Sequence, residues 1–219
     1  MIIHPPKETG LEIAKILLET KAVLIAKDEP FTLTSGRKSP VYIDGKRLIS
    51  FPKHRATIIN AMASLLKERK KEYDVVAGIE SGSIAYAAFM AERLDAPLIY
   101  LRKKPKGFGK QAQVEGIFNQ NDNTLIIEDV TSDGGSKVTF SKVMRDAGGK
   151  VEDIFTIFFY NSFDYSEKIL NEANVNLHYL SSWEFILEAL KTDQSFDTKT
   201  IENIALFLES PDEWAEKVA

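Results

Sequence analysis

The sequence predicts an α/β protein with a mostly parallel, twisted central sheet covered by helices on both faces. Short apolar runs that read as buried strands alternate with stretches whose apolar residues recur at helical spacing. This alternation favours parallel strands joined by helices. The 219 residues are 44% hydrophobic and 27% charged, which is typical of a globular chain able to bury a core.

Each expected element is assigned from its own pattern. The expected strands are apolar and short: Asp74–Gly78, Pro97–Leu101, Thr124–Ile127, Asp153–Tyr160 and Asn176–Leu180. The expected helices carry apolar residues three and four apart: Thr9–Leu18, His54–Leu66, Ile84–Leu94 and Lys137–Ala147. The last helix is followed by Gly148 and Gly149, a common stop signal. The segment Phe31–Ile43 mixes short β-prone runs with a turn.

The carboxy-terminal part of the chain predicts further helices. Ser181 with Glu184, and Ser210 with Glu213, match capping boxes. The large apolar side chains Trp183 and Trp214 are expected to pack rather than bind a ligand. We expect one domain over residues 1–219, with an N-terminal helix and hood segment (1–50), an α/β core (51–180) and a helical tail (181–219).

Composition narrows the classes of function. The chain has no cysteine, which excludes a disulfide or a thiol nucleophile, and its three histidines are too scattered for a zinc site. A net charge of -4 argues against a nucleic-acid partner. The first ten residues do not read as a signal peptide and no apolar run reaches about 18 residues, so we expect no membrane span and a cytoplasmic location.

The strongest motif is a strand that runs into two acids and a glycine-containing loop. Thr124–Ile127 leads into Glu128 and Asp129, and the loop 130–136 precedes a helix. Unpaired amides at a helix start can hold a phosphate, and carboxylates can accept hydrogen bonds from a ribose diol. The loop matches neither the Walker A nor the GxGxxG pattern. An ordinary βα turn with an incidental acid pair remains the alternative.

A second motif is a basic segment, residues 102–116, that reads as a long loop. Five cations lie within nine residues, interrupted by proline and glycine: Arg102, Lys103, Lys104, Lys106 and Lys110. Such a segment can bring positive charge to an anion. The alternative is a solvated basic loop or a weak nucleic-acid patch, and the net acidity of the chain argues against the second.

The strand, acid pair and loop resemble the motif with which type I phosphoribosyltransferases bind 5-phosphoribosyl-1-pyrophosphate (PRPP). The resemblance implies that fold. It also implies that Glu128 and Asp129 meet the ribose, with Asp129 stabilising positive charge at the anomeric carbon. The PRPP-binding loop would comprise Val130, Thr131, Ser132, Asp133, Gly134, Gly135 and Ser136. We expect the Asp133 carboxylate to turn away from the phosphate, because like charges repel, and to cap the helix or meet a cation.

The basic segment resembles the mobile catalytic loop of orotate phosphoribosyltransferases. The resemblance implies that Arg102 and Lys106 are catalytic and bind pyrophosphate, with Lys103 in support. Phe108 lies in the same PRPP-binding segment, where many members carry histidine, and it cannot transfer a proton. In that family the loop reaches the partner's active site, which implies a homodimer sharing residues 102–116.

Residues 31–44 resemble the orotate-enzyme signature F-x-x-x-SG-x-x-SP, which implies that the base is orotate. Tyr42 and Ile43 fall where some members place aromatic residues against the base, and Ser132 also matches a base-contacting position. Thr34 falls where some members place a substrate-binding lysine. Packing in the core is the alternative for Tyr42.

Residues 78–84 resemble the family's pyrophosphate loop, with Ser81 and Gly82 where some members have Tyr-Lys. The resemblance implies magnesium held mainly by PRPP and water, without a dedicated protein cage, and Glu80 is a candidate for placing it. The implied reaction joins orotate to PRPP and releases pyrophosphate, the step that makes the pyrimidine nucleotide. A phosphoribosyltransferase for another base, and a non-catalytic PRPP-binding regulator, remain the alternatives.

Overall fold

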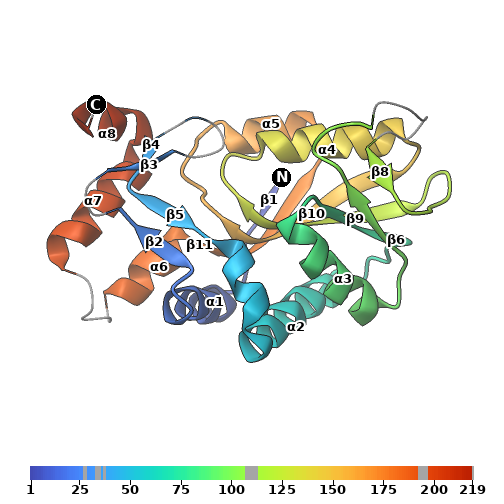
Figure 1. Ribbon diagram of the computed structural model, residues 1–219, viewed down its shortest axis with the longest axis horizontal. Coiled ribbons are helices and arrows are strands. Elements are labelled where there is room, and N and C mark those ends of the chain that lie inside the picture. The colour runs from blue at the N-terminus through green and yellow to red at the C-terminus, as the bar shows by residue number, and fades with distance from the viewer. Residues whose placement is uncertain (27–28, 33–35, 37, 107–112, 192–196, 219) are drawn as a thin grey trace.

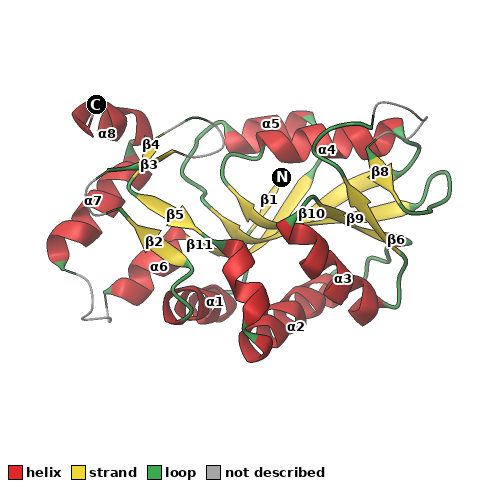
Figure 2. Ribbon diagram, in the orientation of Figure 1, coloured by secondary structure: helices red, strands yellow, loops and turns green. Residues whose placement is uncertain are grey.

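The chain folds around a seven-stranded sheet whose strands are parallel except at one edge. The computed structural model describes residues 1–219 apart from 27–28, 33–35, 37, 107–112, 192–196 and 219 (Figures 1 and 2). The strand order is β1-β11-β10-β9-β6-β7-β8. In that order the strands span Ile2–Ile3, Asn176–Ser182, Lys150–Phe159, Asn123–Thr131, Val75–Ile79, Leu98–Leu101 and Val114–Glu115. Within this sheet, β8 runs antiparallel to β7 and the other pairs are parallel.

Helices cover both faces of the sheet, as the sequence predicts. α1 (Lys7–Glu19), α2 (Pro52–Glu68) and α3 (Gly82–Leu94) lie on one face, and α4 (Gly135–Asp146) and α5 (Ser166–Glu172) on the other (Figure 1). The interior strand β10 is apolar from Ile154 to Phe159 except at Thr156, because neighbouring side chains point to opposite faces and both faces are buried. None of the described helices combines the length and apolarity needed to span a bilayer.

The amino-terminal and carboxy-terminal segments meet at the end of the molecule beside β11. β2 (Val23–Ile25) pairs with β5 (Val41–Ile43), and β3 (Phe31–Thr32) pairs with β4 (Lys38–Ser39). The tail forms α6 (Trp183–Leu190), α7 (Thr198–Glu209) and α8 (Pro211–Val218), and α8 contacts β4. Trp183 and Trp214 are buried, which confirms their predicted packing role. A 3-10 helix, η1 (Gly45–Ser50), leads from β5 to α2.

The structure corrects three local expectations. The capping box at Ser181 is wrong: β11 continues through Ser182, and the Ser181 hydroxyl instead donates to the Gly10 carbonyl, 2.9 Å away. The segment 102–116 is not loop throughout, since Val114 and Glu115 form β8. Neither α5 nor the two-residue strand β1 was predicted from sequence, since β1 is too short to show a period and is defined by its pairing with β11.

Candidate active site

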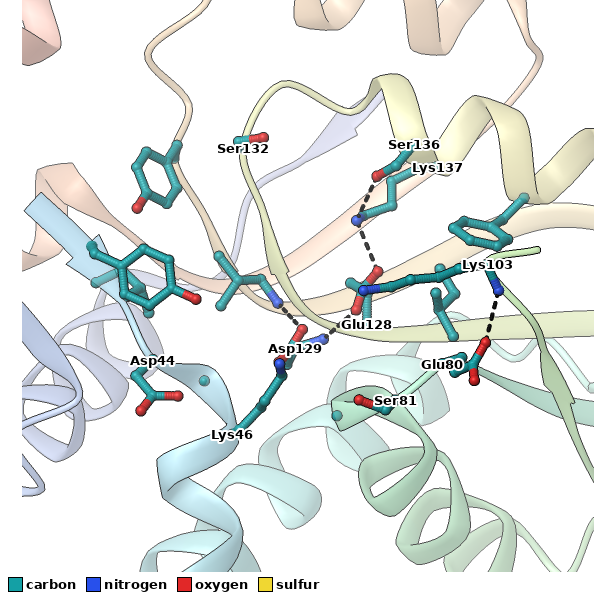
Figure 3. A pocket seen from close by; sticks show the side chains of 18 residues that line it. Asp44, Lys46, Glu80, Ser81, Lys103, Glu128, Asp129, Ser132, Ser136 and Lys137 are labelled. Carbon is teal, nitrogen blue, oxygen red and sulfur yellow. Dashed lines mark hydrogen bonds and ion pairs between the residues drawn. The ribbon is translucent and has the colours of Figure 1, made fainter. Parts of the chain in front are cut away.

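A cavity of about 470 Å³ lies beyond the carboxyl ends of β6 and β9. Parallel strands end at one edge of the sheet, so the loops that follow them meet there. Residues from these loops, from η1, from the basic segment and from the first turns of α4 line the cavity (Figure 3). The predicted site residues among them are Tyr42, Ile43, Ser81, Gly82, Lys103, Glu128, Asp129, Val130, Ser132 and Ser136.

The two adjacent acids at the end of β9 have different environments. Glu128 is buried, and its Oε2 lies 2.9 Å from the Nζ of Lys137, which is buried in the first turn of α4. The Ser83 hydroxyl donates to the other carboxylate oxygen of Glu128. Burial alone would raise the pKa of Glu128, but the Lys137 charge and these hydrogen bonds hold that pKa below its ordinary value. Glu128 is therefore charged at neutral pH.

Asp129 is half-buried beside the charged Glu128. Its Oδ1 accepts a hydrogen bond from the Val130 amide at 2.9 Å. Burial, followed by the neighbouring Glu128 charge, raises the pKa of Asp129 to about 7. The carboxyl can therefore gain or lose a proton near neutral pH, while still facing the cavity.

The turn between β9 and α4 offers unpaired amide donors at the start of a helix. Gly134 has a φ of 90°, a conformation that side chains disfavour, which accounts for a glycine at this position. In the described part of the chain, the amides of Ser132, Gly134 and Ser136 have no hydrogen-bond acceptor. These donors and the partial positive charge of the helix start suit a phosphate group.

Asp133 turns away from the cavity, as expected. Its Oδ1 accepts a hydrogen bond from the Gly135 amide at 3.0 Å, and its Oδ2 accepts one from the Tyr165 hydroxyl at 3.2 Å. Asp133, together with Gly134 and Gly135, is not part of the cavity lining. Its negative charge is thus fixed at the start of α4, on the side of α5.

The turn after β6 lies directly beside the acid pair, because β6 and β9 are neighbouring strands. Glu80 and Ser81 are joined by a cis peptide bond, and both line the cavity with Gly82. The Lys103 amide donates to the Glu80 carboxylate at 3.0 Å, which ties the start of the basic segment to this turn (Figure 3). The Lys103 side chain points across the cavity toward Glu128.

The other two predicted cations of the basic segment lie outside the cavity lining. Arg102 Nη1 lies 3.3 Å from Glu115 Oε1, and Lys106 Nζ lies 2.5 Å from the same oxygen. Phe108 lies outside the described residues, as does Thr34. The structure therefore brings Lys103 to the cavity but pairs Arg102 and Lys106 with a carboxylate of their own segment.

The aromatic side of the cavity is formed by two tyrosines. Tyr42 is 37% exposed and lines the cavity, so it is not a core residue, whereas Ile43 is buried at its edge. Tyr160, which directly follows β10, lines the cavity as well. The sequence pattern predicted a strand that ends at Tyr160 but did not indicate Tyr160 as a site residue.

Three charged lining residues were not predicted from sequence: Asp44, Lys46 and Lys137. Asp44 and Lys46 belong to the turn into η1, a helix that the sequence pattern did not reveal. Lys137 follows the predicted loop directly, so a lysine one residue beyond a phosphate-binding turn was the available signal.

The described residues contain no group of three or more His, Asp or Glu side chains placed to hold a metal ion. The carboxylates that line the cavity are Asp44, Glu80, Glu128 and Asp129, and Glu128 is already paired with Lys137. This donor set fits a magnesium ion that keeps most of its ligands from a bound phosphate and water.

Comparison with known proteins identifies the family. No protein-family model matches the chain. An orotate phosphoribosyltransferase of Agrobacterium fabrum is 44% identical over 207 residues, covering 94% of this chain and 89% of that protein. The chain belongs to the orotate phosphoribosyltransferase family. An orotate phosphoribosyltransferase of Cereibacter sphaeroides is 40% identical over 215 residues, 97% of this chain and 93% of that protein.

Solved structures agree with this family. An orotate phosphoribosyltransferase from Aeropyrum pernix matches with a TM-score of 0.71 and 29% identity, over 82% of this chain and 98% of that one. The UMP synthase of Leishmania donovani matches with a TM-score of 0.78 and 26% identity over 92% of this chain, which spans 42% of that longer protein. The fold is that of the type I phosphoribosyltransferases, and the orotate phosphoribosyltransferase resemblance stated from sequence is confirmed.

Proposed function

We propose that the chain transfers the 5-phosphoribosyl group of PRPP to orotate, giving orotidine 5′-monophosphate and pyrophosphate in pyrimidine biosynthesis. One observation carries the proposal beyond family membership. Unpaired amides at Ser132 and Ser136, which line the cavity, adjoin the Glu128–Asp129 acid pair, and the unpaired Gly134 amide lies in the same turn. A phosphate and a ribose diol, held one beside the other, match these two neighbouring sets of donors and acceptors.

The residues suggest how the reaction proceeds without a covalent enzyme intermediate. The loop amides hold the 5′-phosphate, and the acid pair accepts hydrogen bonds from the ribose hydroxyls. The bond between the anomeric carbon and pyrophosphate breaks, and its electron pair leaves with pyrophosphate. The Asp129 carboxylate stabilises the positive charge that develops on the ribose. A ring nitrogen of orotate, its proton lost to solvent, forms the new bond to that carbon.

The base and the pyrophosphate are assigned to opposite parts of the cavity. Tyr42 and Tyr160 offer flat surfaces for the planar orotate ring, with Ile43 and the Ser132 hydroxyl beside them. Ser81, Gly82 and Lys103 lie on the pyrophosphate side. Glu80 is the candidate carboxylate for holding a magnesium ion, which would offset negative charge on the leaving group.

Arg102 and Lys106 are proposed to join the site when the basic segment closes. Closure would require both cations to exchange Glu115 for pyrophosphate oxygens, and it would exclude water that otherwise hydrolyses PRPP. We include in the proposal a homodimer in which residues 102–116 serve the partner's cavity, and a cytoplasmic enzyme, which the absence of cysteine suits. Thr34 and Phe108 keep their sequence-based assignments to orotate and PRPP.

The decisive experiment is an assay of the purified protein with PRPP, magnesium and one base at a time. We expect loss of orotate absorbance with equimolar release of pyrophosphate, and no turnover with uracil, adenine, guanine or hypoxanthine. Turnover with another base alone would support the rival transferase. PRPP binding without pyrophosphate release with any base would support the non-catalytic regulator.

A further inference from the structure

Lys46 is a cation of the cavity that the motif comparisons did not assign. Three lysines line the cavity: Lys46, Lys103 and Lys137. Lys137 is neutralised by Glu128, and Lys103 belongs to the basic segment. Within the described residues, the Lys46 ammonium has neither a hydrogen-bond acceptor nor a carboxylate within ion-pair distance. Its side chain points toward Asp129 (Figure 3), so an unpaired positive charge faces the reacting end of the cavity.

The fold holds the backbone of Lys46 in place through its neighbour Gly45. A side chain at Gly45 would lie 2.9 Å from Val130 Cγ2 and 3.0 Å from Asp129 Cβ, so glycine lets η1 pack directly on the end of β9. The hydroxyl of the buried Tyr86 donates to the Gly45 carbonyl at 2.7 Å. This contact holds η1 against α3, and it therefore fixes the backbone position from which the Lys46 side chain extends.

Gly82 makes room for the stem of Lys46 on the opposite wall. A Cβ at Gly82 would lie 2.7 Å from Lys46 Cγ and 3.0 Å from Lys46 Cε. The same Cβ would lie 3.0 Å from Asp129 Oδ2. The aliphatic stem of Lys46 thus lies over the turn that follows β6, and the space above Gly82 is filled by a cation from η1.

We propose that Lys46 binds the pyrophosphate group of PRPP and holds it as it leaves. The proposal rests on the proposed function. The Glu80–Gly82 turn itself supplies no cation, and Arg102 and Lys106 are paired with Glu115. The 5′-phosphate loop already has its own donors. Orotate also carries a carboxylate, but the Lys46 stem lies over Gly82, on the side of the cavity assigned to pyrophosphate, so we assign the Lys46 charge to pyrophosphate.

The test compares Lys46→Met, which keeps the stem and removes the charge, with Lys46→Arg, which keeps both. Lys53→Met is the matched control, since Lys53 is an exposed lysine at the start of the next helix, outside the cavity lining. We expect Lys46→Met to weaken pyrophosphate about tenfold to a hundredfold, the loss usual for a charge-assisted hydrogen bond. Lys46→Arg should recover most of it, and Lys53→Met should change nothing.

Two measurements locate the effect. Equilibrium titration with magnesium pyrophosphate reports binding without turnover, and initial rates give the KM values for PRPP and orotate separately. We expect weaker pyrophosphate binding and a raised PRPP KM or lowered kcat, with orotate KM unchanged. A normal pyrophosphate titration in Lys46→Met, or a rise confined to the orotate KM, would overturn the assignment. Failure of the unmodified protein to turn over orotate would instead remove the proposed function, and the two failures are therefore distinct.

Discussion

Lys106 Nζ lies 2.5 Å from Glu115 Oε1, so a cation predicted to meet pyrophosphate is held by a carboxylate of its own segment. Arg102 Nη1 lies 3.3 Å from the same oxygen. The hydrogen bond and charge of Lys106, with help from Arg102, hold the pKa of Glu115 below its ordinary value, so the carboxylate stays charged at neutral pH. Because all three side chains reach solvent, the pairs are weak and a polyanion can displace Glu115.

Glu115→Gln is therefore expected to strengthen the binding of PRPP. The variant removes the competing negative charge, and the KM for PRPP should fall about twofold to fivefold, within the range typical of solvent-exposed ion pairs. The effect should shrink in high salt, since exposed charges are screened. Glu152→Gln is the control, because Glu152 pairs with Lys71 on a different part of the surface. A raised PRPP KM in Glu115→Gln would mean that the pairs order the segment for catalysis instead.

The sequence predicted those parts of the site that lie within one continuous stretch. The strand, Glu128, Asp129 and the following loop are adjacent in the chain, so their chemistry could be inferred without knowing the fold. The tyrosine at position 42 was found because its motif is local as well. The strand and loop assignments needed only the periodicity of the strand and the donors of a helix start, whereas Tyr42 was assigned by resemblance to a family signature.

The roles of Lys46 and Lys137 depend on packing between elements, although the position of Lys137 directly after the loop was a local signal. Lys137 matters through Glu128, which reaches it only when β9 and α4 pack together. Lys46 reaches the cavity because Gly45 packs on β9 and Gly82 leaves space on α3. Asp44-Gly45 and Ser81-Gly82 are dipeptides typical of turns, but that signal does not reveal which segment packs against each glycine. Tertiary packing, not local pattern, selects these residues.

Asp133→Ala tests the orientation of the carboxylate inside the anion-binding turn. The variant removes the acceptor of the Gly135 amide and the Tyr165 hydroxyl, and it should destabilise the protein by about 1 kcal/mol, as loss of a helix cap does. The KM for PRPP should stay within about twofold, since the carboxylate does not face the cavity. Asp133→Asn, which keeps an acceptor, should recover most of the stability in urea unfolding. A large gain in PRPP affinity on Asp133→Ala would place the charge beside the phosphate.

The buried pair of Lys137 and Glu128 predicts strong coupling between two substitutions. Lys137→Met leaves the Glu128 charge buried without its partner and should lower the free energy of unfolding by about 3 kcal/mol. Adding Glu128→Gln removes that charge and should restore most of the stability, although the ribose-binding carboxylate is lost and turnover stays low. Urea unfolding of the two single variants and the double variant measures the coupling. Additive losses in the double variant would show that the pair is not a unit.

The raised pKa of Asp129 predicts how activity depends on pH. The proposed role needs the negative carboxylate, and the pKa of about 7 means that part of the free enzyme carries a protonated Asp129 at neutral pH. The kcat/KM for PRPP should therefore rise with pH through about 7 and level off above it, because this constant reports groups of the free enzyme. A rate profile measured from pH 5.5 to 9 checks this. A profile flat across pH 6 to 8 would contradict a titrating Asp129.

Asp129→Asn should make the protein more stable at high pH while it lowers turnover. The stability effect follows from the raised pKa of Asp129. The folded-state pKa of about 7 lies above the ordinary value of 3.8, so folding favours the protonated carboxyl. That contribution is fully present below about pH 4 and is lost as the pH rises through about 7. Asparagine does not ionise, so the variant does not lose this stability as the pH rises. At pH 8 the free energy of unfolding of the variant should therefore exceed that of the original protein by roughly 2 kcal/mol, a figure reduced to allow for the partial exposure of Asp129.

The stability gain of Asp129→Asn should shrink toward zero at pH 4, while turnover falls by orders of magnitude at every pH because the charge that stabilises the ribosyl cation is gone. Urea unfolding at pH 4, 6 and 8 beside orotate turnover measures both effects. Ser83→Ala is a useful companion, since it removes a hydroxyl within 3.4 Å of Asp129 Oδ1 without removing a charge. An equal stability difference at all three pH values would show that folding does not shift the Asp129 pKa, which would contradict the raised value.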